Sequence, residues 1–411
     1  MDKELNKTDP AVADINKSEE ERQLETINLI ASENYVSPAV REASSSVFTN
    51  KYSEGYPRKR YYPGNEYVDE VEELAQKRAL EVFGIENSSW AVNVQPYSGS
   101  PANFAVYTAL LSEQDIALGM KLASGGHLTH GHKVSDSGRY FNFIQYGITD
   151  DGIIDYGEVE KLAKEHKPKL IVVGTSAYSL KIDYEKFSNI AKNIGAFLMA
   201  DMAHIAGLVA GGQHPSPFEH CDIVTTTTHK TLRGPRGAMI FSRGDELAVK
   251  VNKAVFPGLQ GGPHNQQTAA IAVAMKEALA PEFKKYAEQI VKNAKVLARE
   301  LKNKGYDIIS GGTENHLFLV DVTNKGMSGG EAEKLLEQAG IIANRNTIPN
   351  DPRKPFDPSG IRIGTPAVTT RGMADVEMKK IADFIDRALK GEDIEGEVKK
   401  LALKFPTPGF E

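Results

Sequence analysis

The sequence has almost no cysteine and no long apolar run. Cys221 is the only cysteine among 411 residues, which excludes a disulfide within one chain and a cysteine-rich zinc site. We expect Cys221 to fill a small space in the core rather than to act as a nucleophile. The sequence contains no run of 18 apolar residues, and the acidic N-terminus lacks a basic stretch followed by an apolar one. We therefore predict no membrane partner and a cytoplasmic protein.

An excess of basic charge is also missing. Lys and Arg total 49 against 55 Asp and Glu, a formal net charge of −6, so nucleic acid is not the expected partner. Hydrophobic residues at 40% and charged residues at 25% are typical of an ordinary globular protein. Because 411 residues exceed the size at which one core stops growing, we expect a large domain and a smaller one.

Three common cofactor and metal motifs are absent. The dipeptide Gly-Lys does not occur, so there is no Walker A loop, and neither G-x-G-x-x-G nor H-E-x-x-H is present. ATPase, dinucleotide-binding and zinc-protease functions therefore lose their best support.

Short apolar runs alternate with amphipathic stretches between residues 90 and 260. The runs WAVNVQ, DIALGM, KLIVVG, AFLMAD, CDIVTTT and GAMIF predict strands, and the segments 101–112, 155–166 and 183–195 predict helices. Gly195 is expected to cap the last of these helices. Such alternation predicts an α/β fold with a mainly parallel sheet.

The two ends of the chain have a different pattern. Residues from about 10 to 30 predict a helical arm, and residues 266 to about 304 predict one long helix that Gly305 closes. Beyond it, HLFLVDV, GGEAEKLLEQAG, GIRIGT and a helix from about 374 to 389 predict an α+β C-terminal domain. No internal repeat or low-complexity segment occurs.

Two polar residues follow consecutive predicted strands. Asp201 ends AFLMAD, and Lys230 follows CDIVTT 29 residues later, so both are expected at the carboxyl ends of strands, where α/β folds bind ligands. A helix cap or a surface acid is an equally good interpretation of Asp201 alone. A lysine in an apolar pocket can act as an amine and form a Schiff base with an aldehyde.

The turn Ser98-Gly99-Ser100 adds a third element. It precedes a predicted helix starting at Pro101, an arrangement that presents backbone N–H groups and hydroxyls to an anion, although such a turn is more often a simple helix cap. Pyridoxal phosphate needs an amine, an acid near its ring nitrogen and a cradle for its phosphate, and these residues supply all three.

Several longer motifs carry a resemblance to a known family. LIASENYVSP, NKYSEGYPRKRYYPGNEY, VQPYSGSPANF, GGHLTHG, DMAHIAGLVA, TTTTHKTLRGPRG, FPGLQGGPHN and GIRIGTPAVTTRG resemble serine hydroxymethyltransferases, in one order from about residue 24 to 389. The resemblance implies a fold-type I pyridoxal-phosphate enzyme, similar to aspartate aminotransferases, that interconverts serine and glycine with tetrahydrofolate. It implies an N-terminal arm (1–60), a large cofactor domain (61–280) and a small α+β domain (281–411).

The resemblance also implies roles for individual residues. The catalytic residues would be Lys230, Glu54, Asp201, His127, His229 and Arg362. Cofactor contacts would come from Ser98, Gly99, Ser100, His127, Ser176, Asp201, His204, His229, Lys230, Gly261 and Gly262. The substrate would meet Ser32, Tyr52, Glu54, Tyr62 and Arg362. The folate site would include Leu122, Gly126, His127, Leu128, Asn346, Pro355 and Phe356. No metal ligand is predicted.

Within this set, Lys230 resembles the lysine that binds the cofactor aldehyde, and Asp201 the partner of the pyridine nitrogen. Arg362 resembles the arginine that clamps the substrate carboxylate, a task that suits its bidentate fork. Tyr52 and Tyr62 resemble residues contributed across a subunit boundary. Gly261 and Gly262 resemble a phosphate contact from the partner chain, so the resemblance implies a homodimer with shared sites, or a tetramer of such dimers.

The sequence departs from the family pattern at a few positions. Tyr97 stands where many members have His, Pro101 where Gln or Ala is common, and HNQQ ends the glycine loop differently. Lys354 replaces a frequent Ser before Pro355, which leaves the carrier open between tetrahydrofolate and a modified pterin. Two other functions stay possible: a folate-independent lyase acting on 3-hydroxy amino acids, and a non-catalytic, RNA-binding protein.

Overall fold

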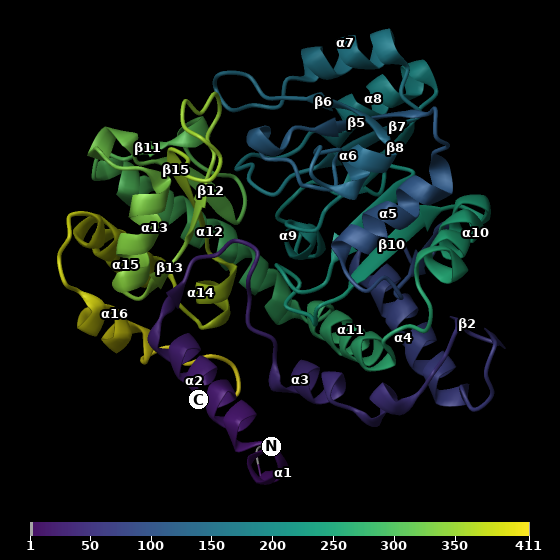
Figure 1. Cartoon of the computed structure of the whole chain (residues 1–411), viewed down its shortest axis with the longest axis horizontal. Helices are drawn as coiled ribbons and strands as arrows, with labels where there is room; N and C mark the ends of the chain where they lie inside the picture. Colours follow the sequence, from purple (N-terminus) through teal and green to yellow (C-terminus); the bar gives the residue numbers. More distant parts are fainter. Residues whose placement is uncertain (1–2, 411) are drawn as a thin grey trace.

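A seven-stranded sheet organises the larger of two lobes in the computed structural model, which describes residues 3–410 (Figure 1). The strand order is β4-β10-β9-β8-β7-β5-β6, and only β10 runs antiparallel to its neighbours. The strands are β4 (Trp90–Asn93), β5 (Ile116–Met120), β6 (Asn142–Tyr146), β7 (Leu170–Gly174), β8 (Phe197–Asp201), β9 (Ile223–Thr227) and β10 (Ala238–Arg243). The predicted α/β class with a mainly parallel sheet is confirmed.

Strand β6 was not predicted from the sequence. It reads NFIQY, so polar Asn142 and Gln145 interrupt its apolar residues, and it lies at the edge of the sheet beside β5. An edge strand buries less apolar surface than a central one, and its pattern is correspondingly weak.

Helices cover both faces of this sheet. Consecutive residues of β8 face opposite sides, so Met199 belongs to one buried apolar cluster and Ala200 to another. Helices α5 and α10 contribute to the first cluster, and α4, α7, α8 and α11 to the second. The helices of this lobe are α4 (Glu66–Val82), α5 (Gly99–Leu110), α6 (Asp136–Tyr140), α7 (Tyr156–His166), α8 (Tyr184–Ile194), α9 (Ala206–Ala210), α10 (Asp245–Lys253) and α11 (Asn265–Ala278).

Two predicted helix ends can be compared with the structure. Helix α8 is capped by the Asp183 side chain and ends at Gly195 with φ of 71°, as predicted. Helix α5 begins at Gly99, so the predicted start at Pro101 was wrong by two residues. Proline is tolerated throughout the first turn because the N–H it lacks has no partner there. Gly99 allows a close approach, since a Cβ would lie 2.8 Å from Cγ2 of Thr227.

The single long helix predicted from residue 266 to 304 was also wrong. The segment forms α11 and then α12 (Pro281–Asn303), with a break before Pro281. Proline disfavours helical geometry in the residue before it and is well placed at the first helical position, so it ends one helix and starts the next.

The smaller lobe has its own antiparallel sheet and its own core. The sheet order is β11-β12-β15-β14, and α12 runs between the lobes, with Phe283 in the core of the larger lobe and Leu297 in that of the smaller one. Its elements are β11 (Asp307–Ile308), β12 (Leu317–Asp321), α13 (Gly329–Gln338), β13 (Ile341–Ile342), β14 (Asn344–Asn346), β15 (Gly360–Gly364), α14 (Pro366–Thr370), α15 (Asp375–Leu389) and α16 (Glu395–Ala402).

The N-terminal segment crosses from the smaller lobe to the larger one. The predicted helix of residues 10–30 ends early, because α2 stops at Glu25 and Ile27 and Leu29 are fully buried in the smaller lobe's core. The elements are α1 (Lys3–Thr8), α2 (Pro10–Glu25), β1 (Ile27–Asn28), which pairs with β13, α3 (Pro38–Ser44), and the hairpin of β2 (Gly55–Tyr56) and β3 (Lys59–Arg60). The domain boundaries at residues 60 and 280 stay predictions.

Two expectations from composition can be checked here. Cys221 is buried, and burial raises the pKa of its thiol, as expected for a core residue without nucleophilic character. Among residues 3–410, no helix combines the length and the hydropathy that crossing a bilayer requires.

Candidate active site

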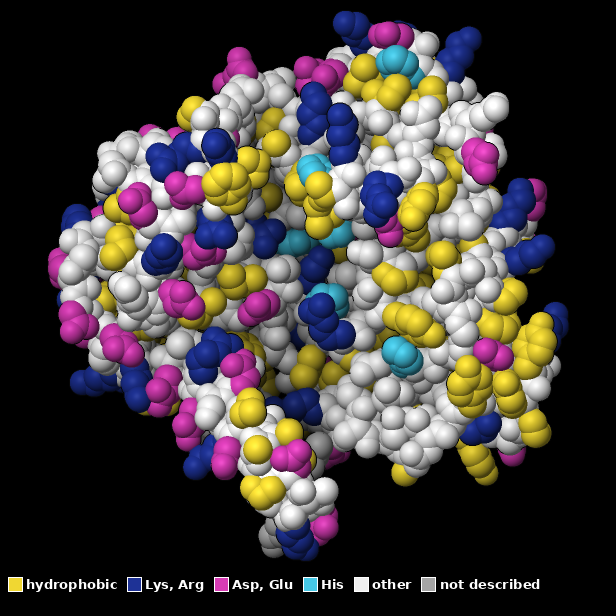
Figure 2. All heavy atoms as spheres, viewed as in Figure 1, with side chains coloured by type: hydrophobic (Ala, Val, Ile, Leu, Met, Phe, Trp, Pro, Cys, Tyr) yellow, Lys and Arg dark blue, Asp and Glu magenta, His cyan; other side chains and the backbone are white. Residues whose placement is uncertain are grey.

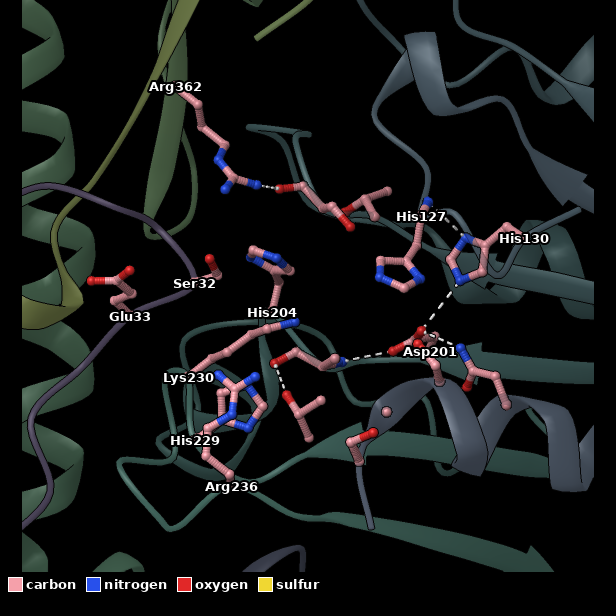
Figure 3. Close-up of a pocket in the computed structure, with 18 residues that line it drawn as sticks. Ser32, Glu33, His127, His130, Asp201, His204, His229, Lys230, Arg236 and Arg362 are labelled. Carbon is pink, nitrogen blue, oxygen red and sulfur yellow. Dashed lines mark hydrogen bonds and ion pairs between the residues drawn. The ribbon is translucent and has the colours of Figure 1, made fainter. Parts of the chain in front are cut away.

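A cavity of about 420 Å³ lies where the two lobes meet. Figure 2 shows histidine and basic side chains in the hollow between the lobes, and Figure 3 shows the residues that line it. Most come from loops at the carboxyl ends of strands in the larger lobe, Arg362 comes from β15, and Ser32 and Glu33 come from the segment after β1.

Eleven predicted site residues line this one cavity. They come from seven separate parts of the chain, and they are Ser32, Ser98, Gly99, Ser100, His127, Ser176, Asp201, His204, His229, Lys230 and Arg362. The remaining predicted residues lie elsewhere and are described below.

Lys230 follows β9, which runs parallel to β8 and beside it, so the adjacent strand ends place Lys230 and Asp201 at one edge of the sheet. Within residues 3–410, the Lys230 Nζ makes no hydrogen bond, although Asn34 donates to the Lys230 carbonyl oxygen at 2.8 Å. Burial lowers the pKa of Lys230 to about 8, with Asp201 opposing the shift and Arg362 adding to it. The amine is therefore closer to its reactive neutral form than a surface lysine is.

Threonine hydroxyls hold the loop around Lys230. Thr228 donates to the Pro235 carbonyl oxygen at 2.6 Å, and Thr231 donates to the His204 carbonyl oxygen at 3.0 Å. Both side chains are fully buried. Buried hydroxyls need partners, so these bonds tie the loop to its neighbours and position Lys230.

Asp201 is held as an ionised carboxylate. Its Oδ2 accepts hydrogen bonds from Asn103 Nδ2 at 2.8 Å and from His130 Nε2 at 3.2 Å, and its Oδ1 accepts from the Ala203 N–H at 3.0 Å. Burial alone would raise its pKa, but these partners, with His130 foremost, lower it well below the usual range. A permanent negative charge therefore lies at the floor of the cavity (Figure 3).

The proton on His130 can be placed from its contacts. Its Nδ1 accepts from the backbone N–H of His127 at 3.2 Å, so its Nε2 carries the hydrogen that Asp201 accepts. His127 itself has its Nδ1 2.8 Å from the Thr129 hydroxyl, and burial lowers its pKa to about 4. His127 is therefore a neutral, flat ring that borders the cavity above Asp201.

The start of α5 provides an anion site. Ser98 is its N-cap, yet the Ser98 side chain makes no capping bond, so its hydroxyl stays available together with the free N–H groups of Gly99 and Ser100. Exposed Arg236 lines the same cavity and adds positive charge. These groups fit a phosphate.

Arg362 extends from the smaller lobe into the cavity. One nitrogen donates to the Ser176 carbonyl oxygen at 2.7 Å and another to Asn344 Oδ1 at 3.2 Å. Burial lowers the pKa of Arg362 to about 10, which still leaves it charged at neutral pH. The structure shows no carboxylate paired with this guanidinium among residues 3–410. It is therefore prepared to bind an anion such as a substrate carboxylate.

His229 and His204 flank Lys230 (Figure 3). Burial lowers the pKa of His229 to about 3 and that of His204 well below its usual value, so both rings are neutral. The His229 Nδ1 is enclosed and has no partner among residues 3–410. Such an orphaned polar atom at a cavity is typical of a ligand site.

Five predicted residues form a separate surface, here called the tyrosine patch: Tyr52, Glu54, Tyr62, Gly261 and Gly262. The Tyr52 hydroxyl lies 3.3 Å from Glu54 Oε1, and the rings of Tyr52 and Tyr62 meet edge to face at 5.2 Å. A Cβ on Gly261 would lie 3.2 Å from Glu54, so the glycine loop borders these side chains. Tyr52 is 54% exposed and Tyr62 45%, and in the described chain no patch residue lines the Lys230 cavity.

Arg60 holds the backbone on both sides of Glu54. Its Nη1 donates to the carbonyl oxygens of Ser53 at 3.0 Å and Gly55 at 2.8 Å. Its other nitrogens pair with Asp69 at 2.8 Å and Glu72 at 2.7 Å, and its side chain is only 4% exposed. Buried and fully partnered, Arg60 fixes the loop that presents Glu54.

Two of the departures from the family pattern, Tyr97 and the HNQQ segment, lie beside this patch. The Tyr97 hydroxyl donates to the Gly262 carbonyl oxygen at 2.8 Å, and its ring stacks on His264 at 4.2 Å. Asn265 donates to the Lys51 carbonyl oxygen at 2.7 Å. These two departures thus support the glycine loop and replace none of the cavity's groups.

The predicted folate positions come from three parts of the chain. Leu122 and Leu128 are partly exposed and Phe356 is 69% exposed, while a Cβ on Gly126 would collide with the Met120 carbonyl. Asn346 ends β14, and Pro355 lies in the loop before β15. Only His127 of the predicted folate set lines the Lys230 cavity.

Several residues of the site were missed from the sequence. Asn103, His130, Glu33 and Arg60 all contact or line the features described above. His130 lies inside the motif GGHLTHG, three residues after His127, so the motif contained a signal. Asn103 and Arg60 also lie inside the motifs VQPYSGSPANF and NKYSEGYPRKRYYPGNEY, but those motifs do not show that their partners are Asp201 and Glu72.

The fold and the site together define a class: an α/β protein that places a buried lysine amine, an ionised carboxylate and an anion-binding helix start around one cavity. A family model for serine hydroxymethyltransferase matches residues 5–385. The chain belongs to the serine hydroxymethyltransferase family.

Curated relatives agree over nearly the whole length. The serine hydroxymethyltransferase of Acidothermus cellulolyticus is 55% identical over 99% of this chain and 97% of its own. The enzyme of Desulfotalea psychrophila is 55% identical over 99% of this chain and 96% of its own. The enzyme of Sorangium cellulosum is 54% identical over 99% of this chain and 97% of its own. The likeness therefore includes both lobes and the segment that crosses between them.

Proposed function

We propose that the protein transfers a one-carbon unit between serine and tetrahydrofolate, in the manner of its family. In the forward direction, serine and tetrahydrofolate give glycine, 5,10-methylenetetrahydrofolate and water. The observation that carries this proposal is the unpaired Lys230 amine, with its lowered pKa, in a cavity bounded by Asp201 and Arg362.

The residues present fit pyridoxal 5′-phosphate. Lys230 offers an amine, Asp201 a carboxylate held ionised, and the start of α5 offers free N–H groups and the uncapped Ser98 hydroxyl. The fit also accounts for the unpartnered Nδ1 of His229 at this cavity. When bound, the cofactor supplies an electron sink for the pair of electrons released when the bond between the substrate Cα and Cβ breaks.

The chain's own residues then have defined tasks. Arg362 binds the substrate carboxylate, since its charge has no carboxylate partner within the described chain. Asp201, supported by His130 and Asn103, keeps a positive ring nitrogen protonated. His127 covers one face of the site, His204 and Ser176 line it, and Ser32 borders it from the segment after β1.

The proposed fold is of the fold-type I class, similar to aspartate aminotransferases. We assign the large cofactor domain to residues 61–280, the small domain to 281–411 and the arm to 1–60. Separate apolar cores in the two lobes support this division.

The tyrosine patch supports a homodimer. Its exposed tyrosines and glycine loop stand apart from the cavity of the same chain, yet they surround Glu54, a carboxylate suited to moving the proton of a serine hydroxyl. We infer that two copies exchange these residues, so that Tyr52, Glu54 and Tyr62 of one protomer border the Lys230 cavity of its partner and Gly261 and Gly262 extend its phosphate site. Aromatic side chains are enriched at such interfaces.

The carrier is proposed as tetrahydrofolate, with a modified pterin as the alternative. Exposed Leu122, Leu128 and Phe356 offer apolar contacts for a flat bicyclic ring, with Gly126, Asn346 and Pro355 beside them. Lys354 lies 5.8 Å from the Phe356 ring centre and favours an anionic tail on the carrier.

A carrier-dependent product assay tests the proposal. Purified protein loaded with pyridoxal phosphate is given serine alone, serine with tetrahydrofolate, or serine with a modified pterin, and glycine is quantified. We expect turnover to require a reduced pterin. Equal glycine formation without any carrier would show a lyase acting on 3-hydroxy amino acids instead, and a colourless protein that ignores the cofactor would show a binding protein.

A further inference from the structure

His316 is a buried histidine that the proposed reaction does not yet use. It lies directly before β12, is 1% exposed, and its Nε2 is 3.2 Å from Nδ1 of His204, which lines the cavity. His204 belongs to the larger lobe and His316 to the smaller one. The two rings are therefore a polar contact between the lobes, next to Lys230.

The surroundings keep both rings neutral. Burial lowers the pKa of His316 to about 3, and the charges of Arg362 and Lys230 act in the same direction. Burial, followed by the charges of Lys230, Arg362, His316 and His127, lowers the pKa of His204 well below its usual value. Two neutral imidazoles joined by one hydrogen bond share a single proton in that bond.

This arrangement couples the two outer nitrogens. If His316 Nε2–H donates, His204 carries its own hydrogen on Nε2, toward the cavity, and His316 Nδ1 is bare. If His204 Nδ1–H donates, His204 Nε2 is bare and His316 Nδ1 carries a hydrogen. The His316 Nδ1 is enclosed and has no partner among residues 3–410. A buried N–H without a partner is rarer than a buried acceptor without one, so the first arrangement is favoured.

We propose that His316 is a positioning residue that donates from Nε2 to His204 Nδ1 and so keeps His204 as a neutral hydrogen-bond donor facing the cavity. The positive charges of Lys230 and Arg362 attract a bare Nε2 and oppose this state in the empty cavity. An anionic ligand neutralises that attraction. The donor form of His204 is therefore expected once the cavity holds its anionic cofactor and substrate, which makes this inference dependent on the proposed function.

The backbone around the pair supports a positioning role. The Thr365 N–H donates to the His316 carbonyl oxygen at 3.0 Å, and β12 pairs with β15, where Leu319 lies opposite Arg362. On the other side, Thr231, the residue after Lys230, bonds to the His204 carbonyl oxygen. The pair thus lies between the strand that carries Arg362 and the loop that carries Lys230.

The direct test is nuclear magnetic resonance of protein labelled with 15N in histidine. The one-bond 15N–1H coupling identifies which nitrogen of His204 and of His316 carries the hydrogen, with resonances assigned from His204→Asn and His316→Gln variants. In the holoenzyme with glycine bound, we expect hydrogen on Nε2 of both rings. A bare His204 Nε2 in that complex would overturn the inference, whatever the enzyme's activity.

Two substitutions of His316 separate donation from packing. His316→Gln keeps an N–H near the position of Nε2, so His204 should retain its donor form and kcat should stay within about twofold of wild type. His316→Leu cannot donate, so kcat should fall by about tenfold, the worth of one hydrogen bond, while the KM for serine changes little. Equal damage by Gln and Leu, or no change with Leu, would contradict the role.

His214→Leu is the matched control. His214 is similarly buried but bonds to the Ile182 N–H and the Pro215 carbonyl oxygen and to neither ring of the pair. We expect this variant to lose stability without changing the proton position on His204. If His316→Leu does not fold, the 15N spectra of wild type and His316→Gln still decide the matter. Loss of cofactor colour in wild type would instead count against the proposed function.

Discussion

The cavity around Lys230 and the tyrosine patch around Glu54 differ in how far one chain completes them. In the cavity, the carboxylate of Asp201 has three donors, and burial holds His127, His204 and His229 neutral. In the patch, Glu54 has one long contact with Tyr52, and two tyrosines are about half exposed. The difference teaches that one chain by itself sets the electrostatics of the cavity, whereas the patch would be enclosed only in the proposed dimer.

The largest expected effect comes from the cavity. Lys230→Gln removes the amine while keeping a polar side chain of similar length, and we expect kcat with serine and tetrahydrofolate to fall by roughly 10²–10⁴ or more. Rapid-quench and steady-state assays of glycine formation measure this loss. Ordinary kcat in this variant would remove Lys230 from the reaction. Asn34→Ala, which removes the hydrogen bonds of Asn34 to the Lys230 carbonyl oxygen, Tyr286 and Thr370 but leaves the amine in place, is a milder control.

Mixed dimers test whether the patch serves the partner's cavity. Lys230→Gln and Glu54→Gln chains are inactive or nearly so alone, but random mixing should restore about a quarter of wild-type activity, because half the dimers carry one intact shared site. Differently tagged chains, refolded together and purified as heterodimers, provide the measurement. No recovery in verified heterodimers would show that each chain uses its own Glu54.

A smaller effect is expected from the support beneath Glu54. Arg60→Lys loses the fork that spans Ser53, Gly55, Asp69 and Glu72, and we expect kcat to fall by roughly tenfold with cofactor absorbance unchanged. Steady-state kinetics and a cofactor titration measure the two quantities.

The matched control lies on the same hairpin. Arg58 pairs with Glu73 at an exposed site, so Arg58→Lys should leave kcat unaltered. If Arg60 acts through Glu54, adding Arg60→Lys to the Glu54→Gln variant should lower kcat only slightly further. Full additivity of the two losses would mean that Arg60 affects the enzyme by another route.

The smallest expected effect is a pH dependence of the free energy of unfolding, which comes from buried histidines. Burial lowers the pKa of His127 and His214 to about 4 and of His229 and His316 to about 3. Since the unfolded chain binds these protons at higher pH, the contribution of these histidines to the free energy of unfolding should be constant above about pH 7 and fall as pH decreases from about 6.5 to 4.

Denaturant unfolding of the cofactor-free protein at several pH values measures this slope. His214→Asn should reduce the slope by up to ~1.4 kcal/mol per pH unit and leave the curves parallel above pH 7. An unaltered slope would mean that His214 is not protonated on unfolding in this range.

Local patterns predicted much of the fold. The alternation of apolar runs with amphipathic segments gave six of the seven strands in the larger sheet, and Gly195 marked a helix end correctly. Prediction from the sequence pattern failed where that pattern is weak or ambiguous. The edge strand β6 mixes polar and apolar residues, and the Ala- and Lys-rich segment after residue 266 continued its helical period through the break before Pro281.

The sequence alone determined the chemistry: a lysine and an aspartate after neighbouring strands, and motifs that belong to one family. Only the tertiary structure decided which polar groups meet. Asn103 and His130 act through Asp201, 98 and 71 residues away, and His316 meets His204 across 112 positions. Residue types and short spacings show local geometry, but hydrogen bonds between distant segments depend on how the lobes pack, and that is fixed by the buried cores of the whole chain.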